Sequence, residues 1–458
     1  MAETHATNQM ISEELITKAK LIIAEKDRHA LSEIIDLLRP ADMADLVEHL
    51  DPEERLYIFE FLEPEGAGEV LVEIEGPVQE SIMSELDDVS LSQIVQELDS
   101  DDAADLVGDL PMERARQIIS SLKDDVSEEL EKLLPYEEDT AGGILALEFV
   151  AVSSTATVQE AIDNIRRKRE EVGDLFYVFV VDGKGRLAGV VSLKDLVLAS
   201  PDAKIGDVMN PEVISVHVDL DQEEVARLFK RYDLVSTPVV DDDYKLVGRI
   251  THDDVIDVLE EEADEDIARM AGVISAEMAE VSSVKVSRAR LPWLVAGLFG
   301  GILAAVVIKQ FESSLERLLA LSFFFPVIMA MGGNTGTQAA TVAVRGLATG
   351  DISMVNIGKR LCLEMRVALL NGIICGILLG AIVGAWLSDY TLGAVVALSL
   401  VLIIFNSTLV GAAVPLALKR LHIDPALATG PFVTTSNDIL GLLIYLGLVS
   451  LFLHLGAV

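Results

Sequence analysis

Five long hydrophobic segments fill the C-terminal part of the chain, and they constrain its fold more than any other feature. They lie at about residues 292–310, 318–344, 366–388, 393–418 and 427–456. A helix needs roughly 20 apolar residues to cross a bilayer. Because backbone groups in lipid must be hydrogen-bonded within the protein, these segments predict five membrane-spanning helices in a transmembrane domain over residues 290–458.

The charge distribution divides the chain at about residue 290. Before it lie 68 of the 75 acidic residues and 27 of the 35 lysines and arginines, and after it lie 7 acidic and 8 basic residues. An acidic, water-exposed part is therefore joined to a nearly neutral membrane part. Such acidity argues against nucleic acid and anionic lipid surfaces as partners of the first part, and it favours cations as ligands.

One carboxylate, Asp438, lies inside the fifth segment. A charge there costs a few kcal/mol or more, so it usually faces a water-filled cavity and marks an ion path. Gly430-Pro431 precedes it and predicts a helix break, where freed backbone carbonyls can bind a cation. The alternative is a structural carboxylate paired with a basic residue.

A polar stretch, Met331–Gln338, interrupts the hydrophobicity of the second segment. Its three glycines and four polar side chains are costly in mid-membrane unless they are buried against protein or line a pore. The fourth segment adds Asn406-Ser407-Thr408. We therefore expect one path past Asp438, lined by Gly333, Asn334, Thr337, Gln338, Gly430, Thr434, Thr435 and Asn437.

Basic residues predict the orientation of the spans. Lysines and arginines lie before the first segment and between the second and third and the fourth and fifth, whereas the third-to-fourth connection and the C-terminal tail have none. Cytosolic flanks are enriched in such charges. With Lys309 and Arg317 as exceptions, the pattern predicts a cytosolic N-terminus and an outside C-terminus in a cell (plasma or inner) membrane, with membrane lipid around the spans.

Residues 1–137 are typical of an all-α superhelical solenoid. Leucine or isoleucine recurs every 12 residues, at nine positions in register from Leu38 to Leu134. Each unit fits one short helix and a turn, and stacked units of this kind bury a continuous core.

Residues 138–200 and 201–262 predict a tandem α+β module, because the second half repeats the first at an offset of 59. Gly189, Ser192 and Asp195 match Gly248, Thr251 and Asp254. This Gly-x-x-Ser/Thr-x-x-Asp signature, present twice, resembles tandem CBS domains. The resemblance implies a nucleotide site, with ATP as a candidate ligand touching Lys194 and Asp195.

Carboxylates bunch around the second module and run into the helix that follows it. Between Asp253 and Asp266, several pairs three or four residues apart carry like charge. Such pairs destabilise a helix unless cations neutralise them, and Mg²⁺ is a hard cation that prefers oxygen ligands. The alternative is a solvated acidic linker helix.

Taken together, the chain resembles the MgtE family of magnesium channels, also called transporters, over nearly its whole length. The motifs are Pro326…Gly332-Gly333-Asn334-Thr335-Gly336…Gln338 and Pro431…Asp438, after a CBS pair. The resemblance implies a homodimer with a pore on its two-fold axis, where two copies of Asp438 bind hydrated Mg²⁺. It also implies that residues 263–289 form a connecting plug helix.

The resemblance further implies that the acidic part senses Mg²⁺. The implied sensor positions are Glu69, Asp101, Asp105, Gly143, Asp221, Glu223, Asp233, Asp254, Asp257, Glu262, Glu265 and Asp266. One departure is the start of the first CBS copy, Gly142–Glu148, where the family usually has a Met-Thr-Pro-Glu-like sequence.

The expected function is therefore a Mg²⁺-selective channel or transporter for magnesium uptake that closes when Mg²⁺ binds its acidic sites. An ion-coupled divalent-cation carrier and a membrane-anchored CBS nucleotide sensor remain alternatives. We do not expect an enzyme, because the sequence has no Walker A motif, no His-Glu-x-x-His motif and no credible nucleophile–base pair.

Overall fold

The computed structural model describes residues 12–455, except 75, 170–172, 174, 272, 274–282, 349–356, 422 and 429. It divides into two compact units, Met1–Glu262 and Ala263–Val458, which are described separately. Part of the expected plug helix, residues 272 and 274–282, lies outside the described residues.

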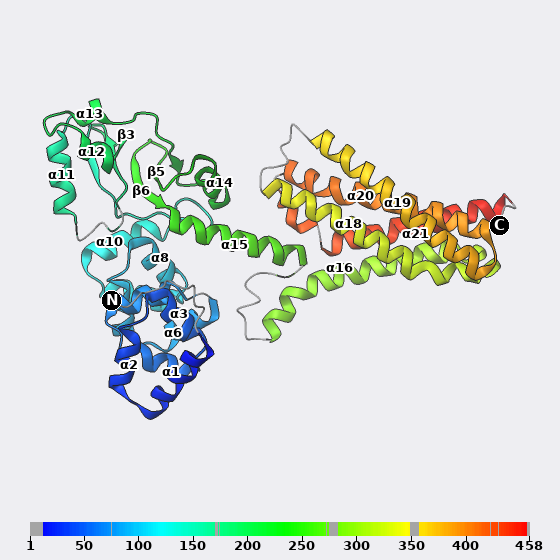
Figure 1. Ribbon diagram of the computed structural model, residues 1–458, viewed down its shortest axis with the longest axis horizontal. Helices are drawn as coiled ribbons and strands as arrows, with labels where there is room; N and C mark the ends of the chain where they lie inside the picture. Colours follow the sequence, from blue (N-terminus) through cyan, green and yellow to red (C-terminus); the bar gives the residue numbers. More distant parts are fainter. Residues whose placement is uncertain are drawn as a thin grey trace, which may run out of the picture. The chain divides into compact units, whose positions relative to one another are not determined.

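The described part of the N-terminal domain has ten short helices, drawn in blue to cyan in Figure 1. Helices two apart in the chain lie against each other, as α3 does with α5 and α8 does with α10. Their bounds are α1 Glu13–Glu25, α2 Arg28–Ile35, α3 Pro40–Glu48, α4 Pro52–Phe59, α5 Pro64–Val72, α6 Gly76–Glu85, α7 Asp88–Val95, α8 Ser100–Gly108, α9 Met112–Ser121 and α10 Asp124–Leu133.

The 12-residue sequence period is the spacing of these helices. From α2 to α10 each helix begins 12 residues after the one before it. Proline occupies the first position of α3, α4 and α5, where its missing N–H is not needed. The repeated residues Leu50, Ile74 and Leu110 are buried, so the period marks the core of the predicted solenoid.

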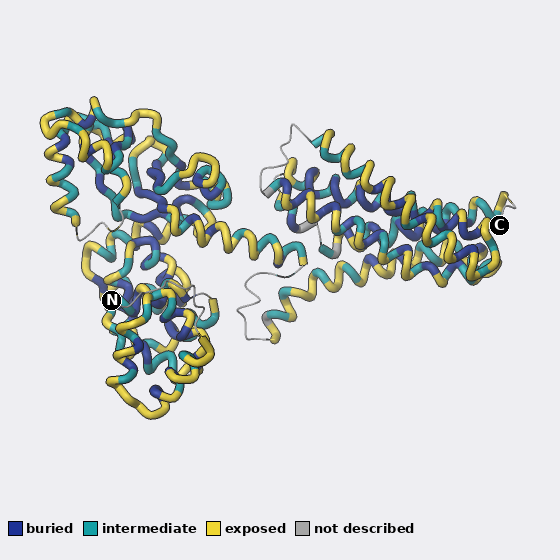
Figure 2. Tube along the Cα trace, viewed as in Figure 1, coloured by how far each residue is buried: buried dark blue, intermediate teal, exposed yellow. Residues whose placement is uncertain are grey.

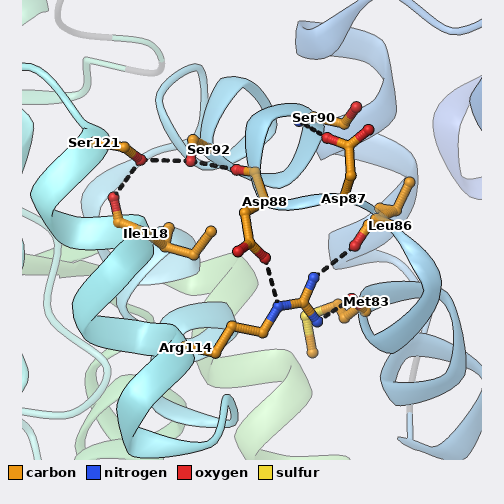
Figure 3. Close-up of polar contacts among 9 residues, drawn as sticks. All are labelled: Met83, Leu86, Asp87, Asp88, Ser90, Ser92, Arg114, Ile118 and Ser121. Carbon is orange, nitrogen blue, oxygen red and sulfur yellow. Dashed lines mark hydrogen bonds and ion pairs between the residues drawn. The ribbon is translucent and has the colours of Figure 1, made fainter.

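Arg114 of α9 joins three of these helices (Figure 3). Its two Nη atoms donate to the carbonyl oxygens of Met83, in the last turn of α6, at 2.6 Å, and of Leu86, just after α6, at 2.5 Å. Its Nε donates to Asp88 Oδ1, at 2.9 Å, at the start of α7. The carbonyls at a helix end lack partners within the helix, so the Arg114 guanidinium supplies hydrogen bonds to the carbonyls at the turn between α6 and α7.

Replacing this guanidinium should loosen the turn. We expect Arg114→Ala to lower the opening free energy of the α6 and α7 amides by about 2 kcal/mol, because charged hydrogen bonds contribute about 1.5–3 kcal/mol each. Native-state hydrogen exchange measures this opening. Arg116→Ala is the matched control, because Arg116 is exposed and its described contact is with Met112 Sδ at 3.6 Å. Equal exchange in both variants would contradict the assigned role.

Two three-stranded sheets with the same topology follow. In each, the first strand is parallel to the second and the second is antiparallel to the third. The strands are β1 Ala151–Ser153, β2 Tyr177–Val181, β3 Leu187–Ser192, β4 Val216–His217, β5 Ser236–Val240 and β6 Leu246–Thr251. The helices are α11 Val158–Arg167, α12 Leu193–Leu198, α13 Ile205–Val208, α14 Gln222–Tyr232 and α15 His252–Ala271.

The segment that opens each module pairs with the sheet of the other module. Ala146 pairs with Arg249 of β6, and Asn210 pairs with Val190 of β3. The signature glycines permit this approach: a Cβ at Gly189 would lie 2.6 Å from Met209 Sδ, and one at Gly248 would clash with Leu145. The start of the first copy, although unusual in sequence, thus takes an ordered place in the structure.

Among its described residues, the second unit has five helices with the length and hydropathy of membrane spans: Val286–Gln310, Leu319–Leu347, Ile357–Leu387, Tyr390–Arg420 and Phe432–His454. They belong to α16 Ser283–Gln310, η2 Leu319–Phe324 with α18 Phe325–Ala348, α19 Ile357–Leu387, α20 Tyr390–Arg420 and α21 Pro431–His454. Between them lie the short helices α17 Glu312–Arg317 and η3 Pro425–Ala428. Burial concentrates on α20, while α16 is mostly exposed (Figure 2).

The polar stretch Met331–Gln338 lies within one continuous helix, since α18 runs from Phe325 to Ala348. Its glycines allow close packing: a Cβ at Gly336 would clash with Asn437, and one at Gly411 would clash with the carbonyl of Gly336. The third helix begins at Ile357, nine residues before the expected start at 366.

Candidate functional sites

Asp438 lies about two turns after Pro431, the first residue of α21. Its side chain is half-buried. Within the described part of the chain it has no hydrogen bond and no ion pair, whereas Asp389 and Asp424 bond to backbone amides. This argues against a structural carboxylate held by a basic partner and leaves Asp438 able to bind a cation.

The polar residues around Asp438 divide into two groups. Asn334, Gln338 and Thr434 are exposed, and Gly333 lies behind Thr434, since a Cβ on this glycine would be 3.6 Å from Thr434 Cγ2. Exposed polar groups on span helices need water or protein around them. These residues therefore remain candidates for the lining of an ion path, with Thr337 half-buried beside them.

Three other predicted lining residues make contacts inside the second unit. Asn437 is 1% exposed and packs against Gly336 of α18. Thr435 packs against Gly300 of α16. The carbonyl of Gly430 accepts hydrogen bonds from the backbone N and the hydroxyl of Thr434, at 3.4 and 3.3 Å. Hence this carbonyl is not freed by the proline, which starts α21 rather than breaking it.

The first unit brings Asp101 and Asp105 of α8 close to carboxylates of other elements. The negative charge of Asp254, at the start of α15, repels that of Asp101, and the charge of Glu261 on the same helix repels that of Asp105. Asp101 is 8% exposed. Asp254 also accepts hydrogen bonds from the hydroxyl and backbone N of Thr251, at 2.7 and 3.1 Å. This interface between α8 and α15 is the acidic interface.

Burial and mutual repulsion make the acidic interface unfavourable for ionised carboxylates. Burial, with the charges of Asp254 and Asp99 next, raises the pKa of Asp102 to about 7. Burial, with Asp102 and Asp109 next, raises the pKa of Asp105 to about 7. Bound cations relieve this kind of repulsion. The donor set, carboxylate oxygen alone, fits Mg²⁺ or Ca²⁺.

Most of the other predicted sensor positions lie elsewhere in the first unit. Gln222 Nε2, beside Asp221 and Glu223 at the start of α14, donates to Glu262 Oε1 of α15 at 2.9 Å. Asp233 ends α14 in the left-handed conformation. Glu69 on α5 and Asp257 on α15 are exposed. Gly143 packs against the carbonyls of Glu137 and Glu138, where a side chain would clash.

Glu265 and Asp266 belong to the second unit. Arg269, one turn after Glu265, pairs with that carboxylate and with Asp424. The Arg269 Nη1 to Asp424 Oδ2 distance is 2.5 Å. Asp424 Oδ1 in turn accepts the backbone N–H of Ala426 in η3, at 2.8 Å. The described end of α15 is thus linked to the segment that leads into α21.

Sequence reasoning missed Asp102 at the acidic interface and Glu148 beside it. Asp102 is adjacent to a predicted residue and could have been found from it, whereas nothing in the sequence links Glu148 to α8. No group of three or more His, Cys, Asp or Glu side chains among the described residues is close enough to hold a metal ion directly. A cation here would need retained water ligands or a small inward movement.

The predicted nucleotide positions lie at an exposed helix start. Lys194 and Asp195 are exposed on α12. Asp195 Oδ2 accepts the hydroxyl of Ser192 at 2.6 Å, and Ser192 Oγ accepts the N–H of Asp195 at 3.1 Å. In the second copy the Thr251 hydroxyl likewise donates to Asp254 Oδ2, at 2.7 Å. Ser192 thus caps α12, and in both modules the signature hydroxyl and carboxylate are hydrogen-bonded to each other.

A polytopic membrane unit joined to an acidic, CBS-containing soluble unit defines a class of cation transporters, and comparisons agree with it. Residues 325–448 match the model of divalent cation transporters, residues 38–139 the MgtE intracellular N domain, and residues 142–202 and 205–261 the CBS domain. A magnesium transporter MgtE of Thermus thermophilus is 44% identical over 71% of this chain and 73% of its own length. One of Bacillus subtilis is 37% identical over 73% and 74%.

Two solved structures cover the first unit. A crystal structure of the cytosolic domain of the Mg²⁺ channel MgtE in complex with ATP has a TM-score of 0.51 and 38% identity, over 53% of this chain and all of that one. The soluble part of a magnesium transporter has a TM-score of 0.50 and 31% identity, over 55% and 99%. The chain belongs to the MgtE family. The predicted fold class is confirmed, and the family consists of transporters and channels rather than enzymes.

Proposed function

We propose that this protein is a Mg²⁺ channel for magnesium uptake and that Asp438 is its pore site. The observation that supports this proposal most directly is the half-buried carboxylate of Asp438. It lies on a span helix and forms no hydrogen bond or ion pair with any described residue. Mg²⁺ keeps several of its waters and accepts one or two carboxylates. Two copies of Asp438 on the axis of a homodimer would supply such a site to a hydrated ion.

The same proposal includes closure by Mg²⁺ on the cytosolic side. The raised pKa values of Asp102 and Asp105 mean that closing the acidic interface costs free energy when the carboxylates are ionised. A cation that binds between α8 and α15 offsets this cost only in the closed arrangement. Differential affinity of this kind is what a ligand needs to shift two states.

The remaining sensor positions enter the proposal as further cation sites. These are Glu69, Gly143, Asp221, Glu223, Asp233, Asp257, Glu262, Glu265 and Asp266. The ion pairs of Arg269 with Glu265 and Asp424 support transmission from α15 to the pore helix. A cation bound to Glu265 would compete with Arg269 for that carboxylate. Arg269 would then pair with Asp424 alone and so fix the segment before α21.

ATP is proposed as a second ligand at Lys194 and Asp195. A related cytosolic domain has been solved in complex with ATP, and both residues are exposed here. The orientation stays the predicted one, with the first unit in the cytosol and the C-terminus outside. The alternatives are an ion-coupled carrier, in which Asp438 would carry protons, and a membrane-anchored nucleotide sensor.

Reversal potentials in proteoliposomes test the proposed function. A Mg²⁺ channel gives a current that reverses at the Mg²⁺ equilibrium potential at both pH 6.5 and pH 8, because no second ion moves with it. A reversal potential that shifts with the proton or sodium gradient would favour the carrier. Absence of Mg²⁺ flux at low and high internal Mg²⁺ would favour the sensor.

A further inference from the structure

Glu148 joins the N-terminal domain to the first CBS module. It lies between the paired residue Ala146 and strand β1, in the segment whose sequence departs from the family pattern. Its Oε1 accepts the backbone N–H of Ser100 at 3.1 Å, and its Oε2 accepts the Ser100 hydroxyl at 2.9 Å. Ser100 Oγ in turn accepts the backbone N–H of Leu147 at 2.9 Å. These three bonds cross 47 or 48 residues of chain.

The position of this contact opposes the repulsion at the acidic interface. Ser100 is the first residue of α8, where N–H groups lack partners within the helix and a negative charge is favoured. One residue later, Asp101 is repelled by Asp254 and by Glu148 itself. The Glu148 carboxylate thus accepts hydrogen bonds from the start of α8, next to the place where carboxylates of α15 repel those of α8. Glu148 is half-buried, and hydrogen bonds to an ionised carboxylate are among the stronger ones.

We propose that Glu148 is a latch, independent of metal, that holds α8 on the first CBS module and so sets the Mg²⁺ concentration at which the cytosolic part closes. The latch rests on the proposed function for its effect on flux, although not for its existence. Glu148 positions the acidic interface and need not touch the ion. Several Mg²⁺ ions together stabilise the closed state. Loss of the Glu148 hydrogen bonds should therefore change the closing Mg²⁺ concentration by a modest factor.

The expected result for Glu148→Ala is a two- to fivefold rise (roughly, since several ions share the lost free energy) in the internal Mg²⁺ that half-suppresses flux. Flux at zero internal Mg²⁺ should equal that of wild type. Glu148→Gln keeps an acceptor for the Ser100 N–H and should show a smaller shift. If Glu148→Gln were as impaired as Glu148→Ala, charge rather than hydrogen bonding would be responsible, and the latch would be wrong.

The matched control is Glu160→Ala. Glu160 makes the same kind of bond, because its Oε2 accepts the backbone N–H of Thr157 at 2.7 Å, but this bond lies entirely within the first CBS module. It should leave the half-suppressing concentration unchanged. Ser100→Ala should reproduce part of the Glu148→Ala shift, and the double variant should not exceed Glu148→Ala, because both remove one contact.

Hydrogen exchange of the full-length protein at saturating Mg²⁺ separates the latch from the proposed function. The Ser100 amide should exchange at least about tenfold faster in Glu148→Ala than in wild type or Glu160→Ala. Unchanged exchange would overturn the latch, as would an unshifted closing concentration in a wild-type background that Mg²⁺ does regulate. Faster exchange in a protein whose flux ignores internal Mg²⁺ would keep the latch and reject the proposed gating.

Discussion

Asp438→Asn should reduce Mg²⁺ flux at least about 100-fold. A unit charge 4 Å from a carboxylate at an effective dielectric constant of 20 interacts by about 4 kcal/mol, and about 1.4 kcal/mol is a factor of ten. Asparagine keeps the size and loses the charge, so the hydrated ion loses its counter-charge in the membrane. Stopped-flow influx into proteoliposomes, with a Mg²⁺ indicator inside, measures the effect.

The control for this variant is Asp389→Asn. Asp389 is an aspartate of the same unit that caps α20 through the backbone N–H groups of Thr391 and Leu392, at 3.0 and 2.9 Å. Asparagine caps a helix as well as aspartate does, so flux should stay at the wild-type level. Flux that survives in Asp438→Asn would move the pore site elsewhere on the membrane unit.

Neutralising the acidic interface should leave the channel open. In Asp101→Asn/Asp105→Asn/Asp254→Asn, we expect flux at high internal Mg²⁺ to stay near its Mg²⁺-free level. Moving a two-state equilibrium from mostly open to mostly closed takes about 5.5 kcal/mol of differential binding, and the variant lacks carboxylates that would supply much of it. The half-suppressing concentration should rise at least about tenfold.

A triple variant of the same charge change distinguishes this from a general effect of acidity. Asp124, Asp125 and Glu128 are exposed on α10, and their neutralisation should not change the Mg²⁺ dependence beyond a small screening effect. If the interface variant instead closed normally, the cations that close the channel would have to bind elsewhere. The proposed sites around Glu262 and Glu265 would then be the next candidates.

The periodic features of the sequence predicted the fold well. The 12-residue leucine period gave the spacing of α2 to α10, and the offset of 59 relates β2 to β5 and β3 to β6. Both periods predict structure because each repeat forms the same elements and packs them in the same way. The five hydrophobic segments correspond to five helices of membrane-spanning length, because a bilayer admits few other structures.

Features that depend on packing between distant segments could not be predicted in the same way. The glycines of α18 contact α20 and α21 closely, and a hydropathy profile does not register such contacts. Its place beside Asp438 predicts Asn437 as a lining residue, yet adjacent residues point about 100° apart on a helix, and Asn437 packs inward. The Glu148–Ser100 contact has no sequence signature, since any acceptor reaching α8 would serve.

The most direct measurement of the central claim is Mg²⁺ flux through the wild-type protein as internal Mg²⁺ is raised stepwise at fixed external Mg²⁺. The account predicts rapid flux at low internal Mg²⁺ and a steep, cooperative fall in permeability, beyond the smaller driving force, as the cytosolic carboxylates fill. Flux that follows the driving force alone across this range would contradict closure by internal Mg²⁺.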